Sequence, residues 1–480
     1  MRLTMQDIKK KTVVSMLSLF LQSGYSAGLG LVANLIITIL LTPKIFGIYI
    51  TVLSMISLLN YFSDIGLAAS LVQKKEIDAE DVRTVFSVQQ LLIITAVLIG
   101  FLASDAVQRF YQLPATGVYL YWALLFSFFL SSLKTIPSIF LERKIHFQKI
   151  VIVQVIENTV FYLTVIVLAI AKFDLTSFTV AVLVRAVAGL AAIYVISPWK
   201  PQIGISFARL KGLLKFGLPF QANSFMALLK DDLMTLYLSK AVGFTGMGYI
   251  GWAKKWAEAP IRIIMDNISR VLFPVIARIQ HETDKVGRLV DKILVYQTIL
   301  LAPVISGAIV LMSVFVEIVP RYNKWAVALP LFYLFIIASF FSSYSSPFTN
   351  LFNALGRIKI SFYFMVFWTA GTWILTPLLT RFLGYYGFPL TQLVLSFAFV
   401  VVVKQAKQLV KFHFWRSVYR PTLAAVIMGL ALAFINLFLL NSLVDLLIMV
   451  MLGALIYVLV LNWIFRVNLV KLIKELGNYS

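Results

Sequence analysis

The sequence contains no cysteine, only three histidines, and less than half as many acidic residues (20) as basic ones (42). Without cysteine the chain can form no disulfide, no thiolate metal site and no cysteine nucleophile. The three histidines, His146, His281 and His413, lie far apart in the sequence and in expected loops. We therefore expect no metal site and no cofactor.

Apolar side chains, in contrast, make up 61% of the 480 residues, whereas soluble domains contain roughly half. They gather in about fourteen segments, and about 20 apolar residues are enough for a helix to cross the hydrocarbon core of a bilayer. We therefore predict an all-α polytopic membrane protein. The expected spans are residues 13–41, 46–72, 84–103, 118–140, 150–171, 176–197, 213–239, 246–277, 293–317, 328–353, 360–381, 386–403, 421–440 and 443–464.

The distribution of Lys and Arg predicts the orientation of these spans. If the N-terminus is cytoplasmic, the cytoplasmic segments hold 28 basic residues and the outer segments hold 7. Cytoplasmic loops of membrane proteins are enriched in Lys and Arg, so we expect both termini in the cytoplasm. The net charge of +22 then follows from topology, and we expect no nucleic-acid partner.

Two related loops indicate an internal repeat. Residues 40–49 (LLTPKIFGIY) and 241–250 (AVGFTGMGYI) each join a first span to a second, and Gly47 and Gly248 are 201 residues apart. An even number of spans per repeat gives parallel repeats, and two such bundles enclose a central cavity. We expect an N-terminal lobe of six spans at 1–197, a cytoplasmic linker at 198–212, a second lobe of six spans at 213–411, and two further spans in 412–480.

Several charged residues fall inside the expected spans, where each costs about 2.5–3.5 kcal/mol unless it faces a cavity or a partner. Arg185 and Arg262 lie near the middle of the sixth and eighth spans. Three others lie toward the cytoplasmic side, namely Asp64, Lys134 and Glu157. Six lie toward the outside, namely Lys230, Asp231, Asp232, Lys254, Lys255 and Glu258.

More than one interpretation is open for these charges. In the eighth span, charges of alternating sign recur every four residues, which predicts either an internally neutralised ladder or a polar face lining a cavity. Arg185 is either a ligand for substrate or the partner of a carboxylate on another helix. Asp64, Lys134 and Glu157 are typical of a structural ion-pair network. The five acidic residues Asp64, Glu157, Asp231, Asp232 and Glu258 are also candidates for coupling to an ion.

Four stretches together resemble the oligosaccharide flippases of the multidrug/oligosaccharidyl-lipid/polysaccharide exporter superfamily, and most closely the lipopolysaccharide and colanic-acid exporters. The resemblance covers roughly residues 10–410 and is weaker in the last two spans. The stretches are LLTPKIFGIYITVLSMISLLNYFSDIGLAASLVQKKEID (40–78), FLERKIHFQK (140–149), KFGLPFQANSFMALLKDDLMTLYLSKAVGFTGMGYIGWAKKWAEAPIRIIMDNISRVLFPVIARIQ (215–280) and SPFTNLFNALGRIK (346–359).

The resemblance implies a bacterial inner-membrane transporter with two six-helix lobes arranged in a V. It implies that the substrate is an oligosaccharide linked through pyrophosphate to a polyprenyl lipid, moved from the cytoplasmic to the outer leaflet. Polysaccharide polymerases and glycosyltransferases are the partners it implies. Arg185 and Arg262 are then candidate ligands for the pyrophosphate, with Lys134, Lys254 and Lys255 extending a basic lining.

Two other functions remain open from the sequence. An ion-coupled drug exporter of the same superfamily relies on buried carboxylates, but here basic residues outnumber acidic ones within the expected spans by a single charge. A membrane polymerase normally places its catalytic residues in a substantial outer loop, and no expected outer loop is longer than about 15 residues. We therefore favour a transporter and expect no enzymatic activity.

Overall fold

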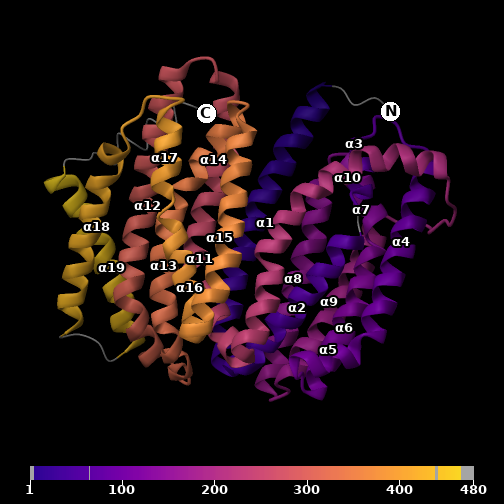
Figure 1. The fold of residues 1–480 in the computed structure, drawn as a ribbon, viewed down its shortest axis with the longest axis horizontal. Coiled ribbons are helices and arrows are strands. Elements are labelled where there is room, and N and C mark those ends of the chain that lie inside the picture. Colours follow the sequence, from indigo (N-terminus) through magenta and orange to yellow (C-terminus); the bar gives the residue numbers. More distant parts are fainter. Residues whose placement is uncertain (1–4, 64, 438–441, 466–480) are drawn as a thin grey trace. The chain divides into compact units, whose positions relative to one another are not determined.

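The protein is described from a computed structural model, which describes residues 5–63, 65–437 and 442–465. Every regular element within these ranges is a helix (Figure 1), which confirms the prediction of an all-α protein. The chain folds into two compact units, Met1–Gly248 and Tyr249–Ser480. The predicted linker at 198–212 does not coincide with this division. The two compact units therefore do not test the predicted lobes at 1–197 and 213–411, which remain a prediction.

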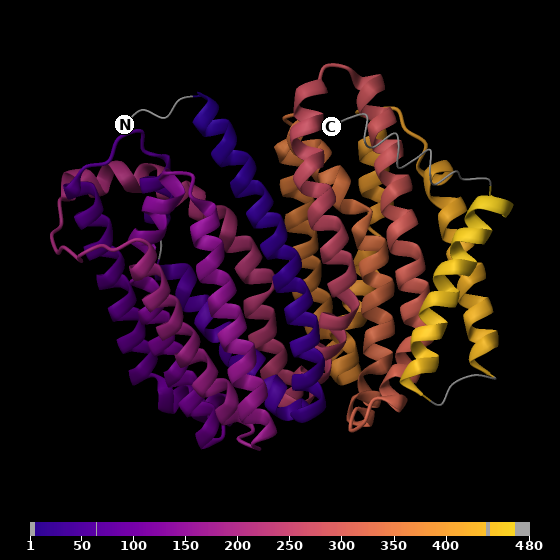
Figure 2. The ribbon, with the colours of Figure 1, turned by 180° about the vertical axis from the view of Figure 1, so that it is seen from behind.

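The first unit contains ten helices and the start of an eleventh. Their bounds are α1 (Met5–Leu40), α2 (Pro43–Ser63), α3 (Leu67–Gln73), α4 (Ala79–Leu102), α5 (Ser104–Tyr111), α6 (Ala115–Ser132), α7 (Thr135–Arg143), α8 (Phe147–Ile170), α9 (Leu175–Ile196), α10 (Phe207–Lys230) and α11 (Asp232–Ile279). Helix α1 is seen along its whole length in Figure 2 and packs against α8.

The second unit contains the remainder of α11 and the helices that follow it. Their bounds are α12 (Thr283–Ile318), η1 (Asn323–Ala328), α13 (Leu329–Ser343), α14 (Ser345–Ala354), α15 (Ile358–Leu383), η2 (Gly384–Tyr386), α16 (Gly387–Ser396), α17 (Phe399–Lys407), α18 (Phe414–Asn436), α19 (Leu443–Leu459) and η3 (Val460–Ile464). The last long helices, α18 and α19, pack against each other and against α12.

Ten stretches of the described residues are helical, long and apolar enough to cross a membrane. One of them, Ile358–Lys407, has 50 residues and contains two of the expected spans, each of about 20 residues. Many side chains of α10 and some of α11 lie outside the described residues, so these ten stretches do not test whether α10 and α11 cross the membrane.

Several expected spans are broken helices, which the apolar pattern did not predict. The span at 46–72 divides into α2 and α3 next to Gly66, whose φ of 80° is the left-handed conformation that glycine adopts readily. The spans at 118–140 and 328–353 divide at Leu133–Lys134 and at Tyr344. Helix α11 is two helices that meet at a kink at Gly243, whose φ of 70° and ψ of 172° are not helical, so the chain breaks within the expected loop between the seventh and eighth spans. The seventh span is itself divided at Asp231, between α10 and α11.

The two loops of the predicted repeat contact each other. A side chain at Gly47 would overlap the backbone of Phe244, and one at Gly248 would overlap the backbone of Pro43. Pro43 and Phe244 are themselves 201 residues apart, as Gly47 and Gly248 are. Adding 201 to the residue numbers of one contact therefore gives the other, which is the reciprocal pattern expected at a two-fold axis. Each of the two contacts requires a glycine.

A buried hydrogen bond also occurs twice, once in each unit. In the first unit the Gln90 amide donates to the Ser132 hydroxyl at 3.0 Å, and in the second the Gln297 amide donates to the Ser343 hydroxyl at 3.0 Å. Each serine ends its helix immediately before the break, α6 before α7 and α13 before α14. The two units therefore share a kinked helix held by a glutamine from a neighbouring helix.

Arg143 fixes the end of α3 beside the first of these kinks. Its guanidinium donates to the carbonyls of Leu71 at 2.6 Å and Lys74 at 2.5 Å, and to those of Val72 and Lys75 at 3.1 Å. The last carbonyls of a helix have no partner within the helix, so a side chain that binds them holds the helix end in place. This contact sets α3 against α7.

Candidate functional site

Arg185 lies on α9 in an aromatic environment. Its guanidinium sits over the ring of Phe161 at 5.6 Å from the centroid, and the hydroxyls of Tyr49 and Tyr162 are within electrostatic range. Tyr49 in turn stacks on Phe178 at 4.0 Å. No carboxylate among the described residues forms an ion pair with Arg185. Arg185 is thus a half-buried cation without a counter-ion among the described carboxylates, and it can bind an anion.

Lys134 and Glu157 form an ion pair in the same unit. Their side chains are 18% and 10% exposed, so water screens the pair only weakly. Gly189 on α9 makes room for the carboxylate, because a side chain there would overlap Glu157. The structure thus brings together two of the three residues predicted as a network, and Asp64, the third, lies outside the described residues.

The charged stripe on α11 includes a ladder of three residues in the second unit. Glu258 lies 2.8 Å from Arg262 and 3.9 Å from Lys254. Because one carboxylate serves two cations, this trio keeps a net positive charge. Arg262 is 70% exposed in the unit, and the Lys254 ammonium also sits 5.7 Å from the centroid of Phe388.

The remaining predicted residues lie on the surfaces of their units or at a helix junction. Lys255 and Asp266 are exposed, and the side chain of Arg270 lies outside the described residues. Asp231 separates α10 from α11, with Lys230 and Asp232 on either side of it.

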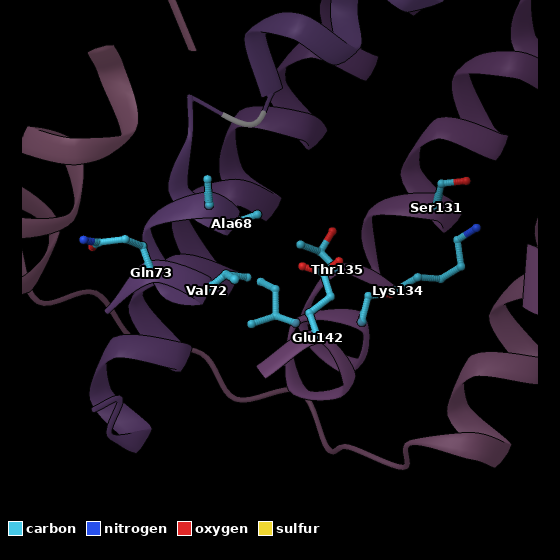
Figure 3. A pocket seen from close by; sticks show the side chains of 10 residues that line it. Ala68, Val72, Gln73, Ser131, Lys134, Thr135 and Glu142 are labelled. Atoms are coloured by element: carbon cyan, nitrogen blue, oxygen red, sulfur yellow. The ribbon is translucent and has the colours of Figure 1, made fainter. Parts of the chain in front are cut away.

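A pocket of about 710 Å³ opens at the kink between α6 and α7, on the side facing α3 (Figure 3). Of its lining residues, only Lys134 was predicted as a site residue from the sequence. A signal was present, because four of its polar residues follow the spacing of one helix face. The lining residues are Ala68, Ala69, Val72, Gln73, Ser131, Lys134, Thr135, Ser138, Ile139 and Glu142.

Glu142 is the acidic residue of this pocket. Burial raises the pKa of its carboxyl above the ordinary value, because a charged carboxylate loses hydration there. No ion pair with a described residue offsets that loss. Among the residues searched, no group of three or more His, Cys, Asp or Glu side chains could hold a metal ion.

The sequence profile of a family described as polysaccharide biosynthesis protein matches residues 36–330. The lipopolysaccharide biosynthesis protein WzxC of Escherichia coli K12 is 27% identical over 346 residues, which are 71% of this chain and 70% of WzxC. The succinoglycan biosynthesis transport protein ExoT of Rhizobium meliloti is 21% identical over 337 residues, which are 70% of this chain and 68% of ExoT.

Among solved structures, the inward closed conformation of the lipid II flippase MurJ matches this fold. The TM-score is 0.76, and the match covers 93% of this chain and 99% of that one. The identity is 14%, so the likeness is one of fold. It fits a polytopic membrane protein built from helices.

Proposed function

The chain belongs to the polysaccharide biosynthesis protein family, whose profile matches more than half of it, and we propose that it flips a polyprenyl-pyrophosphate-linked oligosaccharide from the cytoplasmic to the outer leaflet. One observation carries this proposal. A chain with ten helical stretches long and apolar enough to cross a membrane, among its described residues, has a relative named as a transport protein in succinoglycan biosynthesis. We infer that it is a transporter of the bacterial inner membrane and not an enzyme.

The transport cycle that we propose uses about fourteen spans in two lobes, 1–197 and 213–411, followed by two C-terminal spans, with both termini in the cytoplasm. Support comes from the reciprocal contact at Gly47 and Gly248 and from the glutamine–serine bond present in each unit. Both features are expected of a duplicated bundle. The lobes open the substrate site alternately to the two sides of the membrane.

We propose that Arg185 is the principal ligand for the pyrophosphate. It has no counter-ion among the described carboxylates, and a guanidinium binds phosphate oxygens through paired charge-assisted hydrogen bonds. Arg262 contributes from the ladder on α11, with Lys254 and Lys255 extending the positive charge. Lys134 is held by Glu157 and therefore positions the site more than it binds the anion.

The membrane potential has the sign to assist this movement. One elementary charge crossing 100 mV gains about 2.3 kcal/mol, so the two negative charges of a pyrophosphate diester moving outward from a negative interior gain about twice as much. The gain disappears if the bound arginines move through the field with the substrate. If Arg185 and Arg262 move with the substrate, export depends less on the membrane potential than this calculation gives.

The test is the sidedness of the lipid-linked oligosaccharide in a strain that lacks this chain. A lectin or glycosidase restricted to the outer leaflet detects translocated substrate. We expect the substrate to be trapped inside in the deletion strain and exposed after the wild-type gene is restored. Normal exposure in the deletion strain contradicts the proposal, and drug sensitivity with normal exposure favours an ion-coupled drug exporter.

The same assay tests the arginines. We expect Arg185→Ala and Arg262→Ala each to abolish exposure while the protein still inserts. Arg288→Ala removes the same charge from an exposed position on α12 outside the expected spans, and it serves as the matched control. Full export by Arg185→Ala rules out the proposed pyrophosphate ligand without touching the flippase proposal itself.

A further inference from the structure

The pocket at the α6–α7 kink has the size of a small-molecule site. Its volume of about 710 Å³ lies within the range of roughly 300–1,000 Å³ that such sites occupy. Helix α3 supplies one wall through Ala68, Val72 and Gln73, and the kinked helix supplies the other through Ser131 and Thr135 (Figure 3). Both walls belong to the first unit, so the pocket does not depend on how the units are placed.

Four polar side chains of this pocket have no hydrogen-bond partner within the described part of the chain. Among the described residues, no hydrogen bond or ion pair engages the side chains of Ser131, Thr135, Ser138 or Glu142. Spacings of four, three and four residues put them on one face of the kinked helix. Serine and threonine in a helix commonly bond to a carbonyl one turn back. Free hydroxyls that line a pocket are instead available to a ligand.

The charges of the pocket favour a ligand that is not an anion. The only cation in its lining, Lys134, is paired with Glu157, and its side chain extends away from Glu142 in Figure 3. Glu142 has no such partner among the described residues. A phosphate placed here would meet an unpaired carboxylate and gain little from the neutralised lysine. A neutral group with many hydroxyls would instead donate hydrogen bonds to Glu142.

The apolar part of the lining fits the same chemistry. Val72 and Ile139 lie in the same lining as the free hydroxyls. A sugar ring has C–H faces as well as hydroxyls, so it uses both kinds of surface at once. A site built to bond hydroxyls also discriminates strongly against ligands that lack them, because its own polar groups are then left unpaired.

The second unit provides an internal comparison. After the matching glutamine–serine bond, the next residue is Tyr344, and Phe348 follows one turn later. These side chains are 2% and 0% exposed and belong to a core cluster with Phe352. Counted from the matched serines, these two residues correspond to Leu133 and Pro137, which do not line the pocket. The positions that match Thr135, Ser138 and Glu142 are the half-buried polar residues Ser346, Thr349 and Asn353, so the second unit repeats the polar face without the carboxylate.

We propose that this pocket is a subsite for a sugar residue of the lipid-linked substrate, with Glu142 accepting from sugar hydroxyls and Thr135 and Ser138 completing the hydrogen bonds. This inference rests on the proposed function, because the flippase supplies the glycan. It places the sugar apart from the Arg185 environment, on the expected cytoplasmic end of the first unit. The pocket then selects the glycan while Arg185 binds the pyrophosphate.

The experiment uses the purified full-length protein and the free oligosaccharide released from its lipid. Binding is measured by saturation-transfer NMR with the wild type, Glu142→Gln and the double variant Thr135→Val/Ser138→Ala. We expect binding to the wild type and an at least roughly tenfold weaker affinity in Glu142→Gln, the usual effect of losing a hydrogen bond to a charged group. The double variant loses two neutral hydrogen bonds, whose combined effect is also roughly tenfold. Thr349 is the residue of the second unit that corresponds to Ser138 when Ser132 is matched with Ser343, and Thr349→Val should leave binding unchanged.

Three outcomes overturn the subsite. The wild type fails to bind the oligosaccharide, the pocket variants bind it as well as the wild type, or inorganic pyrophosphate binds in its place and is lost in the same variants. A cooperative thermal transition at a melting temperature no lower than that of the wild type shows that each variant is folded. The sidedness assay with the wild type reads the flippase proposal separately, so failure of the subsite and failure of the flippase are distinguishable.

Discussion

Two cations of the first unit, Arg185 and Lys134, show how the surroundings of a residue decide what it can do. Lys134 has Glu157 as a partner, whereas Arg185 has aromatic rings and no described counter-ion. Breaking a buried pair by removing one partner leaves an uncompensated charge and is strongly destabilising. Substitutions at Lys134 therefore report on stability first, and substitutions at Arg185 report on function first.

Gly189 gives a direct test of the Lys134–Glu157 pair. A methyl group at this position overlaps the Glu157 carboxylate, so Gly189→Ala should lower the stability of the protein by about 1–3 kcal/mol, as overpacking of a well-packed site does. Thermal unfolding in detergent measures the change. Gly28→Ala is the control, because nothing lies within 4 Å of a methyl group there. Equal melting temperatures for the two variants would contradict the packing of Glu157 against Gly189.

Glu142 predicts a pH dependence. Burial raises the pKa of its carboxyl in the folded state, so the folded state binds this proton more tightly than the unfolded state does. Stability from this group is complete below the unfolded pKa and is lost as the pH rises through the folded pKa. Glu142→Gln should therefore raise the melting temperature at about pH 7 and have little effect at about pH 4. A stabilisation of the same size at both pH values contradicts the desolvation of Glu142.

At the scale of helices, the repeated glutamine–serine bonds should differ in strength. Ser132→Ala and Ser343→Ala each remove the acceptor of a buried amide, at a cost of about 1–3 kcal/mol. Gln297 is 0% exposed and Gln90 is 8% exposed, so we expect the larger loss in the second unit. The Ser396 hydroxyl bonds only to a carbonyl in its own turn, which makes Ser396→Ala the control for chemical unfolding of the two variants.

The sequence predicts helices well here and predicts their breaks poorly, and the reason is physical. A hydropathy pattern detects apolar length, so it found the spans around α6–α7 and α13–α14 as single segments. The breaks depend on hydrogen bonds from Gln90 and Gln297, which lie some forty residues away in the sequence. Gly66 could be suspected as a break, but its left-handed conformation depends on the close approach of Gly217.

The candidate site also has one part that could be predicted from the sequence and one part that could not. Lys134 and Glu157 could be expected to meet, because two opposite charges in apolar segments at similar depth lower their cost by pairing. The free hydroxyls of Thr135 and Ser138 gave no comparable signal, since serine and threonine in membrane helices are usually satisfied within the helix. Their role depends on the position of α3, which Arg143 fixes through backbone carbonyls.

At the scale of the whole molecule, the two compact units describe how the chain packs, whereas the spans describe how it crosses the membrane. The unit boundary after Gly248 lies within α11, since residues 232–248 pack with the first unit. Helices α10 and α11 carry the charges at 230–232 and the charged stripe that begins at Lys254, and each such charge is costly inside a membrane. Whether these helices cross the membrane therefore has to be measured. The number of times that α10 and α11 cross the membrane is therefore the most informative property of the topology.

Single cysteines can measure that number, because the natural chain has no cysteine and so no background labelling. We expect a membrane-impermeant maleimide to label Lys172→Cys and Arg381→Cys on intact cells, and Lys144→Cys and Arg357→Cys only after permeabilisation. All four positions are exposed in the structure. If only one of the crossings formed by α10 and α11 is absent, the two sites of the second unit exchange sides.

Loss of both crossings would leave those four sites unchanged, so a fifth site is needed. Thr245 is exposed, lies between the two expected crossings, and follows the non-helical Gly243 on α11. We expect Thr245→Cys to be labelled from outside, because a pair of crossings places the turn at the outer surface. Labelling only after permeabilisation would mean that the charges of α10 and α11 stay on the cytoplasmic side. Arg262 would then lie outside the membrane, and the proposed pyrophosphate site would rest on Arg185 alone.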